Sequence, residues 1–241
     1  MQEQFQRTEM LVGREALTKL AGCRVAVFGI GGVGGYVCEA LARSGIGAFD
    51  LVDKDRVDVT NINRQIIATF DTVGQYKTEA AKQRMLSINP KADIRIWNTF
   101  FLPENADEFP FAEYDYVVDA VDTVTAKIEL IQRAKNAGKP VISAMGAGNK
   151  LRGEQFRIAD LYETSICPLA RVMRKELKKR GVDSLKVVYS EEEPLKPLFS
   201  PQPDEEEANS KRRQTPGSIA YAPAICGLLM AEEILRDLMK K

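Results

Sequence analysis

A glycine-rich segment directly behind a short apolar run places the strongest constraint on how this chain can fold. The apolar run spans Arg24–Phe28, and residues 29–35 read Gly-Ile-Gly-Gly-Val-Gly-Gly, which satisfies the pattern G-x-G-x-x-G. Such glycines permit a tight turn and a close approach of the backbone to a nucleotide phosphate, and a helix that starts near Val33 directs its free N–H groups at the same anion. Asp53 ends the next apolar run, where a ribose-binding carboxylate is expected. The segment therefore predicts a nucleotide site, against the alternative of a tight turn without a ligand. The glycines expected at the phosphates are Gly29, Gly31, Gly32 and Gly34.

The rest of the chain alternates between the periodicities of strands and helices. The predicted strands occupy residues 24–28, 48–52, 94–97, 116–119, 141–144, 155–158 and 185–189. The predicted helices occupy residues 8–20, 33–44, 75–88, 104–109, 123–137, 169–180 and 222–239. Apolar strands that alternate with helices indicate a parallel sheet covered on both faces. We therefore expect a Rossmann-like, doubly wound, mostly parallel α/β fold with an N-terminal helix and a C-terminal strand and helix extension.

Two parts of this single domain differ in character. Residues 1–150 hold the regular alternation and are expected to form the nucleotide-binding core. Residues 151–241 are expected to extend the same domain with the basic helix and the terminal helix. Residues 190–215 contain several prolines, an acidic run and a basic run, which predicts a mobile surface loop.

Composition excludes several classes of protein. The 241 residues carry 34 basic and 34 acidic side chains, so the net charge gives no general attraction to nucleic acid or membranes. No apolar stretch has the length of a membrane span and the first residues are unlike a signal peptide, so we expect a cytoplasmic protein without a membrane partner. The four cysteines form no CxxC pair, which argues against a structural zinc site. The chain has no histidine, so proton transfer would depend on carboxylates, lysine, the substrate or water.

A second set of polar residues follows Asp53 and distinguishes between nucleotides. The connection to the next helix contains Asp55, Asn61 and Arg64, and Lys77 stands near the start of that helix. The Arg64 guanidinium can bind phosphate oxygens as a fork, Lys77 supplies a point charge, and Asn61 donates neutral hydrogen bonds. The pyrophosphate of a dinucleotide is already served by the glycine loop, so these additional groups favour a triphosphate.

Two carboxylates are expected at the carboxyl edge of the sheet. The strand at 116–119 ends in Asp119, and Asp122 follows it. Asp122 is placed to hold Mg²⁺ against the phosphates, because hard oxygen ligands suit that ion. The alternative is a solvated loop in which Asp122 caps the helix that begins at Thr123.

Together these residues resemble the ubiquitin-activating-type, ThiF-like ATP-dependent adenylyltransferases. The resemblance covers roughly residues 1–150, which would then be an ATP-binding adenylation core. It rests on the glycine loop, Asn61-x-Asn63-Arg64-Gln65, Lys77 and the tetrad Asp119-Ala120-Val121-Asp122. Further segments are similar to the tRNA threonylcarbamoyladenosine dehydratase branch and extend the match over most of the chain: residues 5–9, 63–66, 143–150, 160–161 and 168–171.

The resemblance implies a homodimeric enzyme that uses ATP and Mg²⁺ to activate a carboxylate as an acyl-adenylate. In the dehydratase branch this carboxylate belongs to the threonylcarbamoyl group on an adenosine beside the tRNA anticodon. Attack from within the modification then gives a cyclic product and releases AMP. The resemblance assigns Asp53 to the ribose, Asn61, Arg64 and Lys77 to the phosphates and Asp122 to Mg²⁺, with Asp55 as a further cofactor-binding residue. Arg64, Lys77 and Asp122 are also the expected catalytic residues. An N-terminal arginine is also expected to reach the partner's site, with Arg7 the better match and Arg14 the second choice.

Two positions depart from the family's pattern. Relatives usually carry a histidine where this chain has Ile67, and often an aspartate where it has Cys167. Cys167 is the thiol that we expect to be exposed, and nearby cations would lower its pKa. An incidental surface cysteine is the simpler interpretation, since no general base lies near it in the sequence.

The basic helix at 169–180 has two interpretations. It is either an amphipathic surface helix with Val172, Met173 and Leu177 on its apolar face, or a surface that follows tRNA phosphates. The residues that would then bind tRNA are Arg171, Arg174, Lys175, Lys178 and Lys179.

Other functions stay open at this point. One is an adenylyltransferase that activates the C-terminus of a ubiquitin-like or sulfur-carrier protein, which typically has paired zinc cysteines or a catalytic thiol. Another is a NAD-dependent oxidoreductase or a non-enzymatic nucleotide sensor, neither of which explains Arg64, Lys77 and Asp122 together. A sulfur-transfer or other protein partner is equally open.

Overall fold

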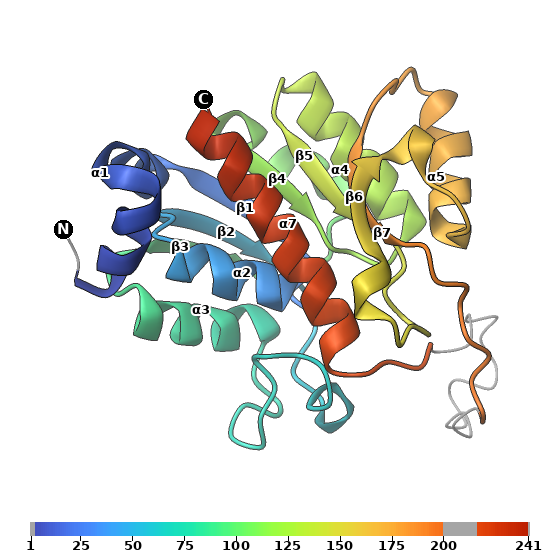
Figure 1. Ribbon diagram of the computed structural model, residues 1–241, viewed down its shortest axis with the longest axis horizontal. Helices are drawn as coiled ribbons and strands as arrows, with labels where there is room; N and C mark the ends of the chain where they lie inside the picture. Colours follow the sequence, from blue (N-terminus) through green and yellow to red (C-terminus); the bar gives the residue numbers. More distant parts are fainter. Residues whose placement is uncertain (1–2, 200–215, 241) are drawn as a thin grey trace.

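The computed structural model describes residues 3–199 and 216–240, which form a seven-stranded sheet between layers of helices (Figure 1). The strand order is β3-β2-β1-β4-β5-β7-β6, and every neighbouring pair is parallel except β6 with β7. The strands are β1 (Arg24–Phe28), β2 (Ala48–Val52), β3 (Asp93–Trp97), β4 (Tyr116–Asp119), β5 (Val141–Ala144), β6 (Phe156–Asp160) and β7 (Lys186–Ser190). The prediction of a mostly parallel α/β sheet is confirmed.

Helices cover both faces of the sheet, as predicted. They are α1 (Gln6–Gly22), α2 (Gly34–Arg43), α3 (Lys77–Ile88), α4 (Val124–Asn136), α5 (Pro168–Lys178) and α7 (Tyr221–Lys240). Val25 and Val27 of β1 join a core cluster with α1, α2, α3 and α7, whereas Ala26 and Phe28 join a second cluster with α4 and α5. The two clusters follow from the alternation of side chains along a strand.

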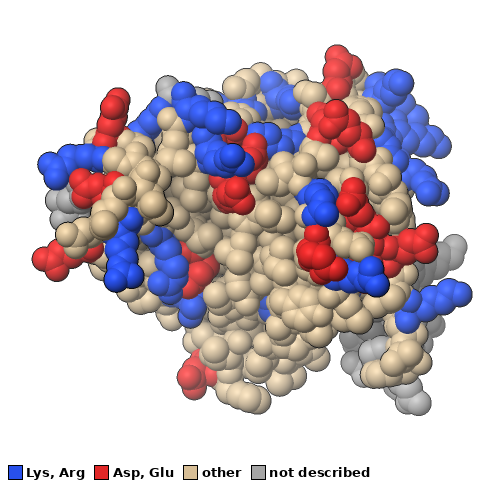
Figure 2. All heavy atoms as spheres, in the orientation of Figure 1, with Lys and Arg blue, Asp and Glu red and all other residues tan. Residues whose placement is uncertain are grey.

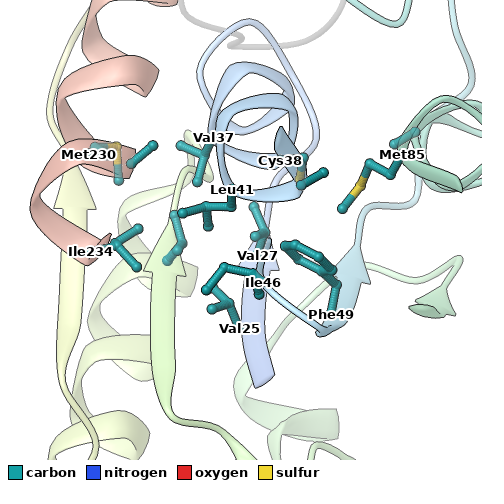
Figure 3. Packing of buried hydrophobic residues seen from close by; sticks show 14 of the residues in the cluster. Val25, Val27, Val37, Cys38, Leu41, Ile46, Phe49, Met85, Met230 and Ile234 are labelled. Atoms are coloured by element: carbon teal, nitrogen blue, oxygen red, sulfur yellow. The ribbon is translucent and has the colours of Figure 1, made fainter. Parts of the chain in front are cut away.

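The start of α2 is fixed in place by α7. Figure 3 shows Val37 and Leu41 of α2 directed towards Met230 and Ile234 of α7. A Cβ atom at Gly227 of α7 would lie 2.4 Å from the Val33 carbonyl oxygen, so only glycine permits this approach. This contact holds the N-terminus of α2 at the carboxyl edge of the sheet.

Some elements differ from their predictions. The helix expected at 104–109 is a 3₁₀ helix at Pro103–Glu108, because so short a segment, started by proline and with Ala106 as its one buried residue, has no apolar face for an α-helix. Helix α1 contains a non-helical residue at Gly13, where φ is 81°. The expected mobile loop lies largely outside the described residues, which omit 200–215. Within the described ranges no helix is long and apolar enough to cross a membrane.

Candidate functional site

The carboxyl ends of β1, β2 and β4 open on a cleft of about 690 Å³. Its walls come from the glycine loop, the connection after β2, the start of α3 and the loop after β4. The residues predicted from the sequence that line this cleft are Gly29, Gly31, Gly32, Asp53, Asp55, Asn61, Arg64, Lys77 and Asp122. Segments that are distant in the sequence therefore meet at one place.

The glycine loop has the close contacts that its sequence predicts. Gly29 has a φ of +90°, and a Cβ atom there would lie 2.5 Å from the Ala120 carbonyl oxygen. Gly34 does not line the cleft, contrary to its predicted place at the phosphates. A Cβ atom at Gly34 would lie 1.9 Å from the Gly29 carbonyl oxygen, so this glycine lets α2 start directly against the loop. The cleft thus faces the N-terminus of α2, where N–H groups favour an anion.

Backbone N–H groups orient the Asp53 carboxylate. Ile30 N donates to its Oδ2 at 2.7 Å, and Asp55 N donates to its Oδ1 at 2.8 Å. Burial raises the pKa of Asp53, and the positive charge of Lys77 opposes this rise. Each carboxylate oxygen can accept a further hydrogen bond, so Asp53 can still bind two hydroxyl groups of a ribose.

Two cations lie on the cleft wall. Lys77 is buried and its Nζ lies 2.8 Å from Asp55 Oδ2. Arg64 Nη1 donates to Thr60 O at 2.9 Å and to Asn63 Oδ1 at 2.8 Å. Burial lowers the pKa of Arg64, yet a guanidinium stays charged at neutral pH. Within the described chain Arg64 has no carboxylate partner, which leaves its charge available to a ligand.

A buried amide adds an acceptor that the sequence analysis did not assign. Gln65 lines the cleft at 6% exposure, and its Oε1 has no hydrogen-bond partner in the described structure. Neighbouring Asn61 uses its Oδ1 to accept from Asp58 N at 3.2 Å, which closes a capping box. Gln65 follows Arg64 directly in the run Asn63-Arg64-Gln65. This adjacency was the signal in the sequence that could have assigned Gln65 to the site.

The strand β4 delivers one carboxylate to the cleft, not two. Asp122 is exposed there, and Thr123 Oγ1 donates to it at 3.2 Å. Asp119 is fully buried away from the cleft, where both its oxygens lie 3.0 Å from Lys127 Nζ. As the last residue of β4, Asp119 points at α4, while Asp122 follows in the loop. In the described ranges no cluster of three or more acidic or cysteine side chains could hold a metal ion alone.

One wall of the cleft comes from residues that the sequence analysis did not assign to the site. Gly148 lines it beside Pro216, and a Cβ atom at Gly148 would lie 2.9 Å from Pro216 Cβ. Asn149 N donates to Gly217 O at 2.8 Å, and Gly217 N donates to Asn149 Oδ1 at 2.7 Å. Lys54 and Phe100 also line the cleft, and Lys54 Nζ lies 4.6 Å from the centre of the Phe100 ring.

The predicted trans arginines lie outside the cleft of their own chain. Arg7 and Arg14 are both exposed on α1, and Arg14 Nε binds Glu9 Oε1 at 3.0 Å. The cations predicted to bind tRNA lie on α5 or, for Lys179, directly after it, and they do not line the cleft either.

The expected exposure of Cys167 is wrong. Cys167 is 3% exposed and belongs to the second core cluster, because it stands directly before α5, whose Ala170 and Met173 are buried in the same cluster. Cys167 is therefore no candidate for a surface thiol nucleophile. Ile67, the other departure, is buried in the first cluster and acts in packing.

Comparisons with known proteins agree with this architecture. The ThiF family model matches residues 5–241. The tRNA threonylcarbamoyladenosine dehydratase of Bacillus subtilis (strain 168) is 40% identical over 244 residues, which cover 100% of this chain and 96% of that protein. The Haemophilus influenzae protein of the same name is 37% identical over 238 residues, covering 94% and 90% respectively. The crystal structure of the E. coli tRNA N6-threonylcarbamoyladenosine dehydratase TcdA in complex with ATP superposes with a TM-score of 0.87 at 33% identity, covering 99% of this chain and 94% of that chain. The chain therefore belongs to the ThiF family.

Proposed function

We propose that this chain is an ATP-dependent tRNA threonylcarbamoyladenosine dehydratase. The observation that carries the proposal is the match along the whole chain to the B. subtilis dehydratase, at 40% identity. The E. coli dehydratase with a similar fold was crystallised with ATP. The proposed enzyme adenylates a carboxylate on tRNA and then closes a ring within the modification.

The unpaired groups in the cleft fit a nucleoside triphosphate. Gln65 Oε1 is buried without a donor, and Arg64 has no carboxylate partner in the described structure. Asp53 is held by two backbone N–H groups in an orientation that suits ribose hydroxyls. We assign the phosphates to Arg64, Lys77, Asn61 and the glycine loop, on the strength of their shared position in the cleft.

In the proposed reaction, an oxygen of the threonylcarbamoyl carboxylate attacks the α-phosphorus of ATP. The bond from that phosphorus to the bridging oxygen breaks, and pyrophosphate leaves. An atom within the modification then attacks the activated carbonyl carbon, and AMP leaves as the ring closes. Arg64 and Lys77 would stabilise the negative charge that builds on the phosphates, so catalysis is positioning and electrostatics.

Asp122 is the residue that would hold Mg²⁺. It is exposed in the cleft, and in the described structure its contact is a hydroxyl rather than a cation. Magnesium sites commonly use one or two carboxylates and complete their shell with substrate phosphates and water. When bound, the ion would neutralise phosphate charge.

The proposed enzyme is a cytoplasmic homodimer. Its four cysteines are buried, as is common for the thiols of proteins in a reducing compartment. Arg7 is exposed on α1 and outside the cleft of its own chain, so it can act at an active site only by crossing to the partner.

Pyrophosphate exchange tests the proposal. Radiolabelled pyrophosphate should enter ATP only when tRNA carrying threonylcarbamoyladenosine is added, and mass spectrometry of the digested tRNA should show loss of one water. Unmodified tRNA is the matched control. Exchange that depends instead on a sulfur-carrier or ubiquitin-like protein would replace the proposal with the carrier-activating alternative, and no exchange with either substrate would refute adenylation.

A further inference from the structure

Helix α5 turns one face to the core and the opposite face to solvent. Ala170, Met173 and Leu177 are fully buried in the second core cluster. At about 100° per residue, Arg171, Lys175 and Lys178 share the opposite face along about 10 Å of helix axis. All three are exposed, and we name them the α5 ridge. Val172, predicted on the apolar face, is 38% exposed beside the ridge.

The ridge cations differ in having no partner from the other cations in this helix and directly after it. Lys179 Nζ and Arg180 Nη1 bind the Glu176 carboxylate at 2.8 and 2.9 Å. Arg174 is half-buried, and its Nη1 donates to the Thr164 carbonyl at 2.8 Å. Across the described residues the side chains of the α5 ridge have neither an ion pair nor a hydrogen bond. Of the cations predicted to contact tRNA, Arg174 and Lys179 are therefore already engaged.

The ridge begins close to the cleft. Cys167, the residue before α5, has its Sγ 4.0 Å from the position of a Cβ atom at Gly146. The two residues that follow Gly146, Ala147 and Gly148, line the cleft. Arg171 follows one helical turn later, and its N–H bonds to the Cys167 carbonyl at 3.1 Å. Figure 2 shows basic side chains gathered on the side of the molecule where Figure 1 places α5.

We propose that the α5 ridge binds the sugar–phosphate backbone of the tRNA substrate next to the nucleotide in the cleft. This inference rests on the proposed function. A chain with no net charge presents three unpaired cations in one row, so the row attracts a polyanion locally. The contact carries no base specificity, since lysine and arginine on phosphate position a nucleic acid and do not read its sequence.

An acidic protein is the less favoured occupant. The cores of protein interfaces are depleted in lysine and enriched in aromatic residues. The ridge has two lysines and an arginine, and Val172 is the exposed apolar residue among them. This composition fits a phosphate backbone better than a protein surface.

Salt-dependent binding of labelled tRNA tests the inference. The variant Arg171→Gln/Lys175→Gln/Lys178→Gln removes the ridge, and the variant Lys82→Gln/Lys91→Gln/Lys240→Gln removes an equal charge from α3, the turn after it and α7. A second control, Lys179→Gln/Arg180→Gln, removes the cations bound to Glu176. We expect the ridge variant to weaken tRNA binding on the order of 100-fold at 0.1 M salt, and to reduce the slope of log Kd against log salt by about 2 to 3. Both controls should stay within about threefold of the unaltered protein, and ATP titration checks that the ridge variant is folded.

The outcomes separate this inference from the proposed function. If the unaltered protein shows tRNA-dependent pyrophosphate exchange but the ridge variant keeps its affinity and salt slope, the ridge is not the RNA surface. The same conclusion follows if the three-lysine control weakens binding as much as the ridge variant. If the unaltered protein shows no exchange with modified tRNA, the proposed function fails and the ridge inference fails with it.

Discussion

A buried ion pair beneath the cleft gives the sharpest quantitative prediction. Lys127 of α4 and Asp119 of β4 are 1% and 0% exposed. Lys127 Nζ also donates to the Ala144 carbonyl at 2.8 Å, and the Ser143 hydroxyl donates to Asp119. The pair therefore joins α4 to the ends of β4 and β5, the strands whose following loops line the cleft.

Lys127→Met removes the cation and leaves Asp119 in an apolar interior. The folded variant then holds a carboxylate that is buried without its cation. Removing one partner of a buried ion pair costs roughly 3 to 5 kcal/mol of stability in other proteins, and we expect a loss of the same size here. We therefore expect a melting temperature lower by about 6 to 20 °C.

Urea unfolding at pH 7 tests the reasoning. Lys127→Met should lose roughly 3 to 5 kcal/mol of stability, whereas the control Asp119→Asn/Lys127→Met, which carries no charge at either position, should lose markedly less because no charge is left buried without a partner. A deficit below about 1 kcal/mol for Lys127→Met, or an equal deficit for the two variants, would show that the unpaired charge is not the cause and would refute the argument.

Further predictions concern the cleft. Gly34→Ala should destabilise the protein and abolish ATP binding in calorimetry, because its Cβ atom would overlap the Gly29 carbonyl oxygen at 1.9 Å. Arg64→Ala should lower turnover by at least about 100-fold with little change in melting temperature, since in the described structure it pairs with no carboxylate; full activity would move the site elsewhere. ATP affinity should weaken as the pH falls through the raised pKa of Asp53, at a higher pH than for an exposed aspartate, and Asp53→Asn should flatten that profile. Mixing inactive Arg7→Ala and Arg64→Ala chains should restore about a quarter of the active sites, and no recovery would exclude Arg7 as a trans residue.

Helices and strands were predicted best from the sequence where the local pattern of apolar residues agrees with the burial of the segment in the fold. The bounds of β1, β2, β4 and β5 are as predicted, because each is a short, mainly apolar run that alternates with a helical segment. The segment 104–109 shows the limit: a pattern so short does not distinguish an α-helix from a 3₁₀ turn. Cys167 shows a second limit of sequence-based prediction. Cations that are neighbours in the sequence do not indicate whether a side chain just before a helix, here the one that begins at Pro168, points to solvent or to the core.

The site was predictable to the extent that its residues follow strands directly. Asp53 and Asp122 come just after β2 and β4, so the topology brings them together. The wall at Gly148 and Pro216 was not predictable, because its contact joins segments far apart in the chain and involves no charged group. Gln65 lies between these cases: its position was in the motif, but its unpaired oxygen is visible only once burial is known.

The two carboxylates of the Asp119–Asp122 tetrad show why a motif does not by itself assign roles. Asp119 closes β4, so strand alternation turns its side chain into the core, where charge requires a partner and Lys127 supplies it. Asp122 lies beyond the strand, so its side chain reaches solvent and stays free for a ligand. One carboxylate therefore holds strand ends together and the other faces the cleft. Replacing Asp122 should spare stability and replacing Asp119 should not, although both lie in the same short motif.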